Sequence, residues 1–439
     1  MTRRTPAAHR RGAVTLLAAL AGVAVTALGQ AETLEEAWAQ ALQHDQALAA
    51  VRSQAEAAGF QAEAARAQRW PTLAVGGSYN QLDDSPAFDF SFTGLGLTPP
   101  ELFKDDSYVT GSATITVPLF TGGQIASSIR AAEAQQKGAG AQLTAATADT
   151  RLAVADAYVS VLRARKAHDV AASNVETLAS LARDTQSMFE RELVPKNELL
   201  AVQVALANAQ QNELRARQAA EVALAAYNRR LGAPLDRTVD LAESLGAPVD
   251  AAGDLATLIE TARTRRSELA ALDAQAEAYG QLAKAERARV LPHVALSGGY
   301  QYLENQFLDD ETVGMAGIGV QWSVFDGGQS RKRAAALDRT RRSAEQQRAD
   351  AASLVELQVR QAYLGLQESR ARVGVNAQAA EQAEENLRIA RERYGAGLGT
   401  QTQLLEAETL RVQALKNRDD AALDAGLAQL RLARAVGAL

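Results

Sequence analysis

Val117-Pro-Leu-Phe-Thr-Gly-Gly-Gln124 and Trp322-Ser-Val-Phe-Asp-Gly-Gly-Gln329 are two copies of one short corner. Each copy closes a run of alternating residues, typical of a strand, and opens a long run without proline, typical of a helix. Paired glycines let the backbone turn where side chains would clash. We therefore predict strand-to-helix corners at two sets of residues: Phe120, Gly122 and Gly123, and Phe325, Gly327 and Gly328.

The two corners reveal an internal duplication. They lie 325 − 120 = 205 positions apart, and the same offset pairs Tyr158 with Tyr363 further along the chain. Upstream of the corners the offset is 221, which pairs Pro71 with Pro292. The difference, 221 − 205 = 16 residues, is the extra length of one acidic loop in the first copy. The chain is one unit written twice.

The beginning of the sequence is typical of an export signal. Residues 1–31 contain four arginines, an apolar run from Ala13 to Leu28 and a small-x-small cleavage site at Gly29-Gln-Ala31. Removing this segment changes the net charge from 46 − 52 = −6 to 42 − 52 = −10. An acidic, exported chain is a poor candidate for binding nucleic acid.

The composition also argues against several kinds of chemistry. The chain has no cysteine, which excludes disulfides, thiolate metal sites and a cysteine nucleophile, and its four histidines are scattered. The glycines Gly395, Gly397 and Gly399 follow a helix and not a strand, so they do not form a dinucleotide-binding motif. We expect no enzyme, no cofactor, and no catalytic or metal-binding residue. No apolar run of 18 residues follows the signal, which leaves a soluble exported protein or a membrane β-barrel.

Each half is predicted to contain a helix, a strand, a loop, a strand, a long helix, a turn and a return helix. The first repeat spans 32–232, with a helix over 32–68, strands at about 72–82 and 108–119, a long helix over 124–190 and a return helix over 196–231. A linker follows at 233–253. The second repeat spans 254–439, with a first helix, strands at about 293–302 and 313–324, a long helix over 329–394 and a return helix over 401–437.

The lengths of these elements require neighbours. A helix of 67 residues (124–190) would be about 100 Å long and cannot bury itself in a globular core. Four short strands cannot close a barrel, and open strand edges are not tolerated in lipid, so several copies would have to pool their strands. The aromatic residues Trp70, Phe120, Trp322 and Phe325 stand at the strand ends on the helix side, where a membrane-interface girdle belongs.

Taken together, these motifs resemble the TolC-like outer-membrane efflux protein family. They are Arg69-Trp70-Pro71-x-Leu73, the two corners, Tyr394-x-x-Gly397, Leu404-Leu405-Glu406-Ala407 and the closing Leu-Gly. The resemblance implies a mainly α, internally duplicated fold that assembles as a homotrimer. Four strands per chain would form a 12-stranded outer-membrane β-barrel, continuous with a trimeric helical tunnel in the periplasm. It implies passive efflux of small molecules that an inner-membrane pump delivers through a periplasmic adaptor, with outer-membrane lipid around the barrel.

The resemblance also implies a gate at the periplasmic tip. The family's tip tyrosine matches Tyr394, its acidic entrance positions match Gln403 and Glu406, and Glu198 is the acidic position in the first copy. Gly399 stands where a basic link residue is expected. Rings of carboxylates would attract cations and discourage anions. The alternative is that both glutamates simply favour the first turn of a helix, where the helix dipole stabilises them.

The two hairpin turns are predicted to dock the adaptor. They comprise Leu193, Val194 and Pro195 in the first copy and Gly397, Leu398 and Gly399 in the second. Pro195 is expected to turn the chain in one copy as the three glycines do in the other. The alternative for the exposed leucines is capping of the helix pair.

Two other functions remain open at this point. The chain could be the exit duct of a type I protein secretion system, since one sequence does not identify the cargo. It could also be a soluble periplasmic coiled-coil protein, although the repeated outward apolar strand face argues against that class.

Overall fold

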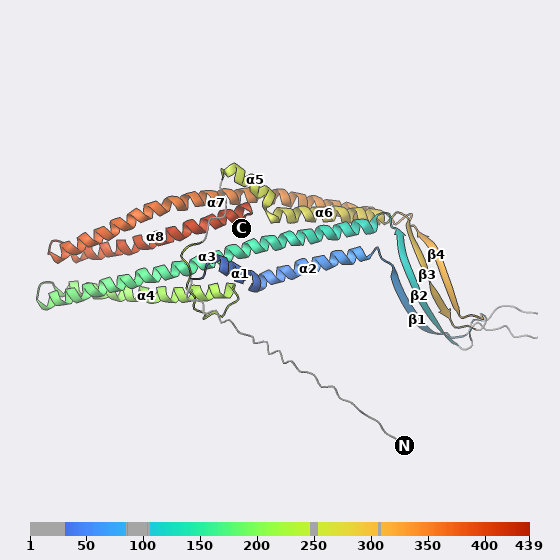
Figure 1. The fold of residues 1–439 in the computed structure, drawn as a ribbon, viewed down its shortest axis with the longest axis horizontal. Helices are drawn as coiled ribbons and strands as arrows, with labels where there is room; N and C mark the ends of the chain where they lie inside the picture. The colour runs from blue at the N-terminus through green and yellow to red at the C-terminus, as the bar shows by residue number, and fades with distance from the viewer. Residues whose placement is uncertain (1–30, 85, 87–102, 104–105, 246–252, 306–308) are drawn as a thin grey trace, which may run out of the picture.

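The computed structural model describes residues 31–84, 86, 103, 106–245, 253–305 and 309–439. The predicted export signal lies outside these residues, except for Ala31. The molecule is elongated, with a β-sheet at one end and two helical hairpins that reach the other end (Figure 1). No helix within the described ranges is both long and apolar enough to cross a membrane.

The two repeats have the same order of elements and similar lengths. The first contains α1 (Leu34–His44), α2 (Gln46–Ala67), β1 (Thr72–Gln81), β2 (Ser107–Phe120), α3 (Gln124–Glu190) and α4 (Lys196–Arg230). The second contains α5 (Leu255–Arg265), α6 (Ser267–Ala288), β3 (His293–Leu303), β4 (Thr312–Gln321), α7 (Gln329–Gly395) and α8 (Gln401–Val436). The two long helices, α3 and α7, have 67 residues each.

Two boundaries differ from the sequence prediction. The single helix predicted over 32–68 is divided into α1 and α2 at Asp45, whose backbone is extended and whose side chain accepts a hydrogen bond from Leu48 N (2.9 Å). The second repeat breaks at the equivalent Arg266, whose backbone is also extended but whose side chain does not cap α6. The last predicted strand ends at Gln321 and not at residue 324, so Trp322 lies beyond β4. Its indole nitrogen donates to Val290 O (3.0 Å).

The four strands form one antiparallel sheet in the order β1-β2-β3-β4. The central pair, β2 and β3, joins the two repeats, and β1 and β4 are the outer strands. The register places Val75, Ala113, Tyr300 and Gly314 side by side. Because strand residues alternate between faces, one face is apolar and the other carries mostly small and polar residues such as Ser78 and Thr110.

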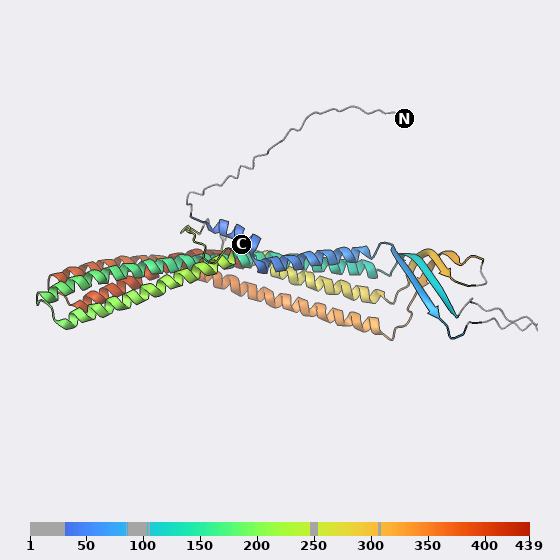
Figure 2. The ribbon, with the colours of Figure 1, turned by 90° about the horizontal axis from the view of Figure 1, so that it is seen from below.

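The long helices lie side by side in the order α4, α3, α8, α7 (Figure 1). Seen after a quarter turn about the long axis, all four run to the same end of the molecule (Figure 2). Buried residues form one cluster around Tyr158 and Val161 in the first repeat and another around Leu269, Val359 and Leu432 in the second.

Both predicted corners have the backbone that requires glycine. The φ angles of Gly122, Gly123, Gly327 and Gly328 are 61°, 87°, 66° and 82°. In the second corner Asp326 also caps α7, because its two carboxylate oxygens accept from the backbone nitrogens of Gly328 and Ser330, each at 2.9 Å. This cap stabilises the start of α7, which begins 329 − 321 = 8 residues after the end of β4, whereas α3 begins 124 − 120 = 4 residues after the end of β2.

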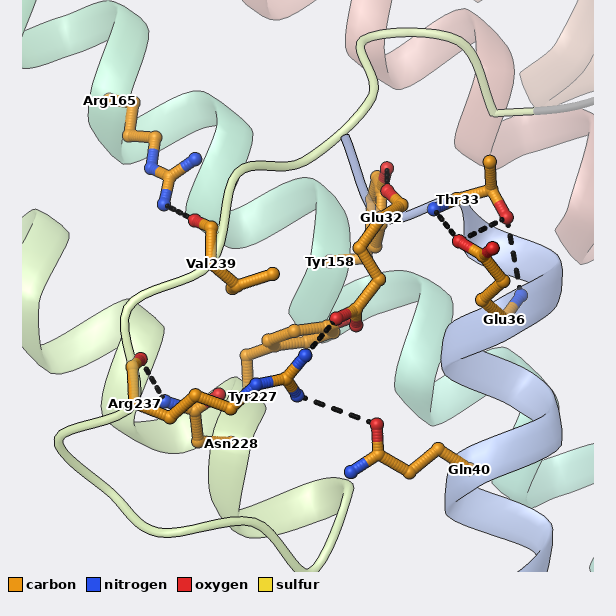
Figure 3. A network of polar contacts seen from close by, with 10 residues as sticks. All are labelled: Glu32, Thr33, Glu36, Gln40, Tyr158, Arg165, Tyr227, Asn228, Arg237 and Val239. Carbon is orange, nitrogen blue, oxygen red and sulfur yellow. Dashed lines mark hydrogen bonds and ion pairs between the residues drawn. The ribbon is translucent and has the colours of Figure 1, made fainter. Parts of the chain in front are cut away.

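In the middle of the first repeat, a polar network joins the residues before α1 to α3, α4 and the segment after α4 (Figure 3). The Glu32 carboxylate accepts a hydrogen bond from the Tyr227 hydroxyl (2.5 Å) and forms an ion pair with Arg237. The Tyr158 hydroxyl lies 2.7 Å from both Glu32 O and Ala242 O. The segment after α4 is thereby held against α1 and α3.

The middle of the second repeat is held by different side chains. Arg266, which is buried, donates to the last carbonyls of α8, Arg434 O (3.2 Å) and Ala435 O (3.3 Å). Its Nε lies 3.0 Å from the Glu268 carboxylate, which also pairs with the Arg434 guanidinium (2.5 Å). An arginine at this position therefore caps the C-terminus of a helix, as basic side chains do favourably.

Candidate functional site

The two hairpin turns lie together at the end of the molecule opposite the sheet (Figures 1 and 2). In the first turn Leu193 N donates to Met188 O (2.9 Å) and Glu192 N to Phe189 O (2.9 Å). In the second, Leu398 N donates to Arg393 O (2.8 Å). Both are Schellman turns, which require a residue in the left-handed conformation.

The residue that turns the chain differs from the prediction. Glu192 (φ 57°) and Gly397 (φ 71°) are equivalent, since 192 + 205 = 397. Pro195 does not make the turn; it is the extended N-cap of α4. Of the three glycines in the second turn, Gly397 alone has positive φ, whereas a Cβ on Gly399 would lie 3.2 Å from Arg393 Cβ. Glu192 is the one non-glycine residue with positive φ among the described residues.

The tips of both turns present apolar side chains to solvent. Leu193 is 69% exposed and its equivalent Leu398 is 73% exposed. Val194 is half-buried and Pro195 is exposed. Each turn therefore leaves a leucine uncovered at the equivalent position.

The structure brings together two of the four predicted gate residues. The Tyr394 hydroxyl lies 3.4 Å from Glu198 Oε2, and Gln401 Nε2 donates to Glu198 O (2.8 Å). Burial raises the pKa of Tyr394, and the charge of Glu198 adds to the increase. Tyr394 therefore stays protonated and can donate to Glu198, linking the two hairpins at the tip.

The other two predicted gate residues lie outside this contact. Gln403 forms a capping box with Thr400: its side chain accepts from Thr400 N (3.2 Å), and Gln403 N donates to Thr400 Oγ1 (3.3 Å). Glu406 is exposed on α8. The Thr-x-x-Gln spacing was a sequence signal for the capping role of Gln403.

A groove lies beside the tip between α3 and α7, with α8 at its base. It has a volume of about 530 Å³ and is lined by residues that include Asp184, Arg191, Arg391 and Tyr394. Glu408 lies at its base, buried and paired with Arg411 (2.7 Å), which also reaches Ser173 Oγ (3.5 Å) on α3. This pair was not predicted, although a Glu-x-x-Arg spacing on one helix face was its signal.

The membrane-interface candidates are exposed at the helix end of the sheet. Trp70, Phe120, Trp322 and Phe325 all present their rings to solvent in the single chain. The described residues contain no group of histidine and acidic side chains that could hold a metal ion.

Comparison with known proteins identifies the family. The model of the family described as outer membrane efflux protein matches residues 37–233 and 258–438, one match for each repeat. The chain belongs to this family of outer-membrane channel proteins, and the predicted resemblance is confirmed. No individual curated protein matches the chain by sequence.

Solved structures of related proteins have the same fold. A membrane protein from Pseudomonas aeruginosa has a TM-score of 0.79 and 19% identity, and the match covers 92% of this chain and 90% of that one. The outer membrane protein VceC of Vibrio cholerae gives 0.78 and 20%, with coverages of 92% and 96%. The Campylobacter jejuni CmeC outer membrane channel gives 0.78 and 15%, with coverages of 93% and 86%. The predicted mainly α, duplicated fold with four strands per chain is confirmed.

Proposed function

We propose that three copies of this chain form a channel through the outer membrane that conducts small molecules passively outward. An inner-membrane pump would supply these molecules through a periplasmic adaptor. The observation that carries the proposal is the sheet: it has one apolar face, one face of mainly small and polar residues, and an outer strand at each side. In lipid such edges must pair, and three copies would supply 3 × 4 = 12 strands for a closed barrel.

The two ends of the chain fit different surroundings. The exposed apolar strand residues, among them Leu73, Val75 and Val320, suit contact with lipid, and the exposed aromatics at the corners suit the interface. The helices extend about 100 Å from there, which suits a tunnel in the periplasm. Planar bilayers containing the purified protein should show discrete conductance steps. A protein that stays monomeric and gives no conductance contradicts the proposal.

The tip is proposed as the gate. In a trimer, Glu198 and Glu406 would form rings of carboxylates, and the Tyr394–Glu198 contact would hold the hairpins together. Replacing both glutamates by glutamine should reduce the preference for cations several-fold in bilayer recordings. Glu63→Gln, an exposed carboxylate on α2 far from the tip, is the matched control. A cation preference that the double variant retains in full contradicts the rings.

The turns are proposed as the adaptor-docking surface, formed by Leu193, Val194, Pro195, Gly397, Leu398 and Gly399. The support is the paired exposure of Leu193 and Leu398. Gly397→Val should abolish drug resistance in cells while the trimer persists, because the left-handed turn that presents Leu398 is strained by a side chain. Gly395→Val, at the helical end of α7 with open space around it, is the control. Full resistance with Gly397→Val contradicts the docking assignment.

A further inference from the structure

Within the chain the two repeats contact each other mainly through β2 with β3, α3 with α6, and α3 with α8. α8 of the second repeat packs beside α3 of the first. Arg163 on α3 pairs with Asp420 (3.2 Å) and Asp424 (2.5 Å) on α8. Next to this pair, Val159 on α3 and Leu427 on α8 belong to one buried cluster and are 2% and 4% exposed.

The matching surfaces on the outer helices have no cover within the described chain. The offset of 205 converts Val159 into Leu364 on α7, which is 54% exposed, and Leu427 into Val222 on α4, which is 62% exposed. α7 and α4 are the outermost of the four long helices in Figure 1, so they do not cover each other. The surfaces around Leu364 on α7 and Val222 on α4 therefore each carry an exposed apolar residue where α3 and α8 carry a buried one. Neither surface has a partner helix in the single chain.

The charges on these two surfaces are complementary. Arg163 corresponds to Glu368 on α7, and Asp420 corresponds to Arg215 on α4. The basic residue of the first pair is replaced by an acidic one and the acidic residue by a basic one. Glu368 and Arg215 would therefore attract each other as Arg163 and Asp420 do. Arg215 is exposed and forms no ion pair with any described residue. Glu368 pairs with Arg372 on its own helix (2.8 Å), so Arg215 of a neighbouring copy would be its second cationic partner.

We infer that α4 of one copy packs against α7 of the next copy, in the register that α8 holds on α3. Glu368 then faces Arg215 of the neighbouring copy, and Leu364 packs beside Val222 of that copy. The inference rests on the trimer proposed above and names the residues of its helical seam. Residue numbers on the two helices run in opposite directions, as they do for Asp156–Arg431 and Arg163–Asp420 within the chain.

The strands indicate the same order of copies, because the equivalent of the β2–β3 pairing would join β4 of one copy to β1 of the next. β2 and β3 pair within the chain, with Ala113 opposite Tyr300. The two offsets convert this pair into 113 + 205 = 318 on β4 and 300 − 221 = 79 on β1. Ile318 and Tyr79 are both exposed and both lie on the apolar face. A shift of one residue would put them on opposite faces, so this register keeps the apolar surface continuous across the seam.

Cysteine cross-linking tests the proposed contact between α4 of one copy and α7 of the next. The chain has no cysteine, so only the introduced cysteines can react. The full-length protein with Glu368→Cys and Arg215→Cys is treated with a short bismaleimide in detergent. It should give dimers and trimers on a denaturing gel, at least tenfold more than Glu368→Cys with Arg229→Cys. Arg229 is also exposed on α4 but lies about 21 Å further along it. Each single-cysteine variant should remain monomeric on the gel.

The strand register is tested by disulfide formation. Ile318→Cys with Tyr79→Cys should oxidise to an intersubunit disulfide, and Ile318→Cys with Asn80→Cys should not. Circular dichroism and native mass, measured on every variant, verify that it folds and assembles. As a second readout on the helices, the exchange of Glu368→Arg with Arg215→Glu should restore the trimer stability that either single change lowers.

The outcomes separate the seam from the channel proposal. If the protein is trimeric by native mass but cross-links through the Arg229→Cys pair, or through neither pair, this register is wrong. The proposed channel is unaffected by that result. A folded protein that is monomeric by native mass overturns both.

Discussion

The two repeats have the same backbone at their turns and different side-chain chemistry at their middles. Helices α4 and α8 both end at a left-handed glycine, Gly232 and Gly437. In the middle, the first repeat relies on Glu32, Tyr158 and Arg237, and the second on Arg266 with Glu268 and Arg434. The difference arises because residues 233–245 follow the first repeat and pack on it. The two repeats have the same path of the chain. The middle of each repeat is stabilised by the different segment that packs on it.

Glu32→Ala is expected to have the largest effect on the middle of the first repeat. It leaves the half-buried Arg237 guanidinium without its ion-pair partner and the buried Tyr227 hydroxyl without its acceptor, at a combined cost of about 3 kcal/mol. We expect a lower thermal midpoint and faster proteolysis of residues 233–245. The neighbouring Glu35→Ala, on the exposed side of α1, should change neither. Equal effects of the two variants would show that the network does not hold the linker.

Alkaline pH should weaken the first repeat through Tyr158. Burial raises the pKa of Tyr158 to about 12, against about 10 in the unfolded chain. Between these values the unfolded chain loses the proton first, so the stabilising contribution is complete below pH 10 and is lost as the pH rises toward 12. In urea unfolding, the stability difference between wild type and Tyr158→Phe should shrink by about 2 kcal/mol from pH 9 to pH 12. A constant difference would place the hydroxyl in contact with water.

Exchanging the residue types of the two turns should change stability in opposite directions. Glu192→Gly should raise the free energy of unfolding by about 1 kcal/mol, because a side chain is strained in the left-handed region. Gly397→Glu should lower it by a similar amount. Thermal unfolding of both variants, with Glu190→Gly as the helical control that is destabilising, measures the effect. Destabilisation by Glu192→Gly would mean that the Glu192 side chain makes a contact that outweighs the strain.

The smallest expected difference lies at the corners. Asp326→Ala removes two 2.9 Å cap bonds and should cost about 1 kcal/mol. Thr121→Ala, at the equivalent position, removes one 3.4 Å bond and should cost about half as much. Chemical denaturation of the two variants side by side checks the order. Equal costs would show that both corners depend on their glycines alone.

Local patterns in the sequence predicted most of the fold. Period-two alternation located the strands and the uninterrupted runs located α3 and α7, because both signals come from neighbouring residues. The break at Asp45 was missed because the helical pattern continues through it. The structure shows a local cap there, Asp45 accepting from Leu48 N, and a distant contact, since a Cβ on Gly232 would be 2.8 Å from His44 Cβ.

The site was predictable only in part for the same reason. Tyr394 and Glu198 were identified through the family resemblance, and the structure brings them together although they are 196 residues apart. The role of Glu32 had no local signal, because its partners are 126 and 195 residues away in the sequence. The left-handed Glu192 also had none, because its residue type does not favour that conformation.

The antiparallel pairing of β2 with β3 has a consequence for the history of the chain. Each repeat alone contributes one hairpin to the sheet, and its helices need neighbours on both sides. A gene that encoded a single repeat could close the same ring with six identical subunits and one kind of seam. In the proposed trimer, half of the seams lie within a chain and therefore cannot separate. The seams within a chain and those proposed between chains can therefore carry different charges, as the opposite signs at the equivalent positions Arg163 and Glu368 do.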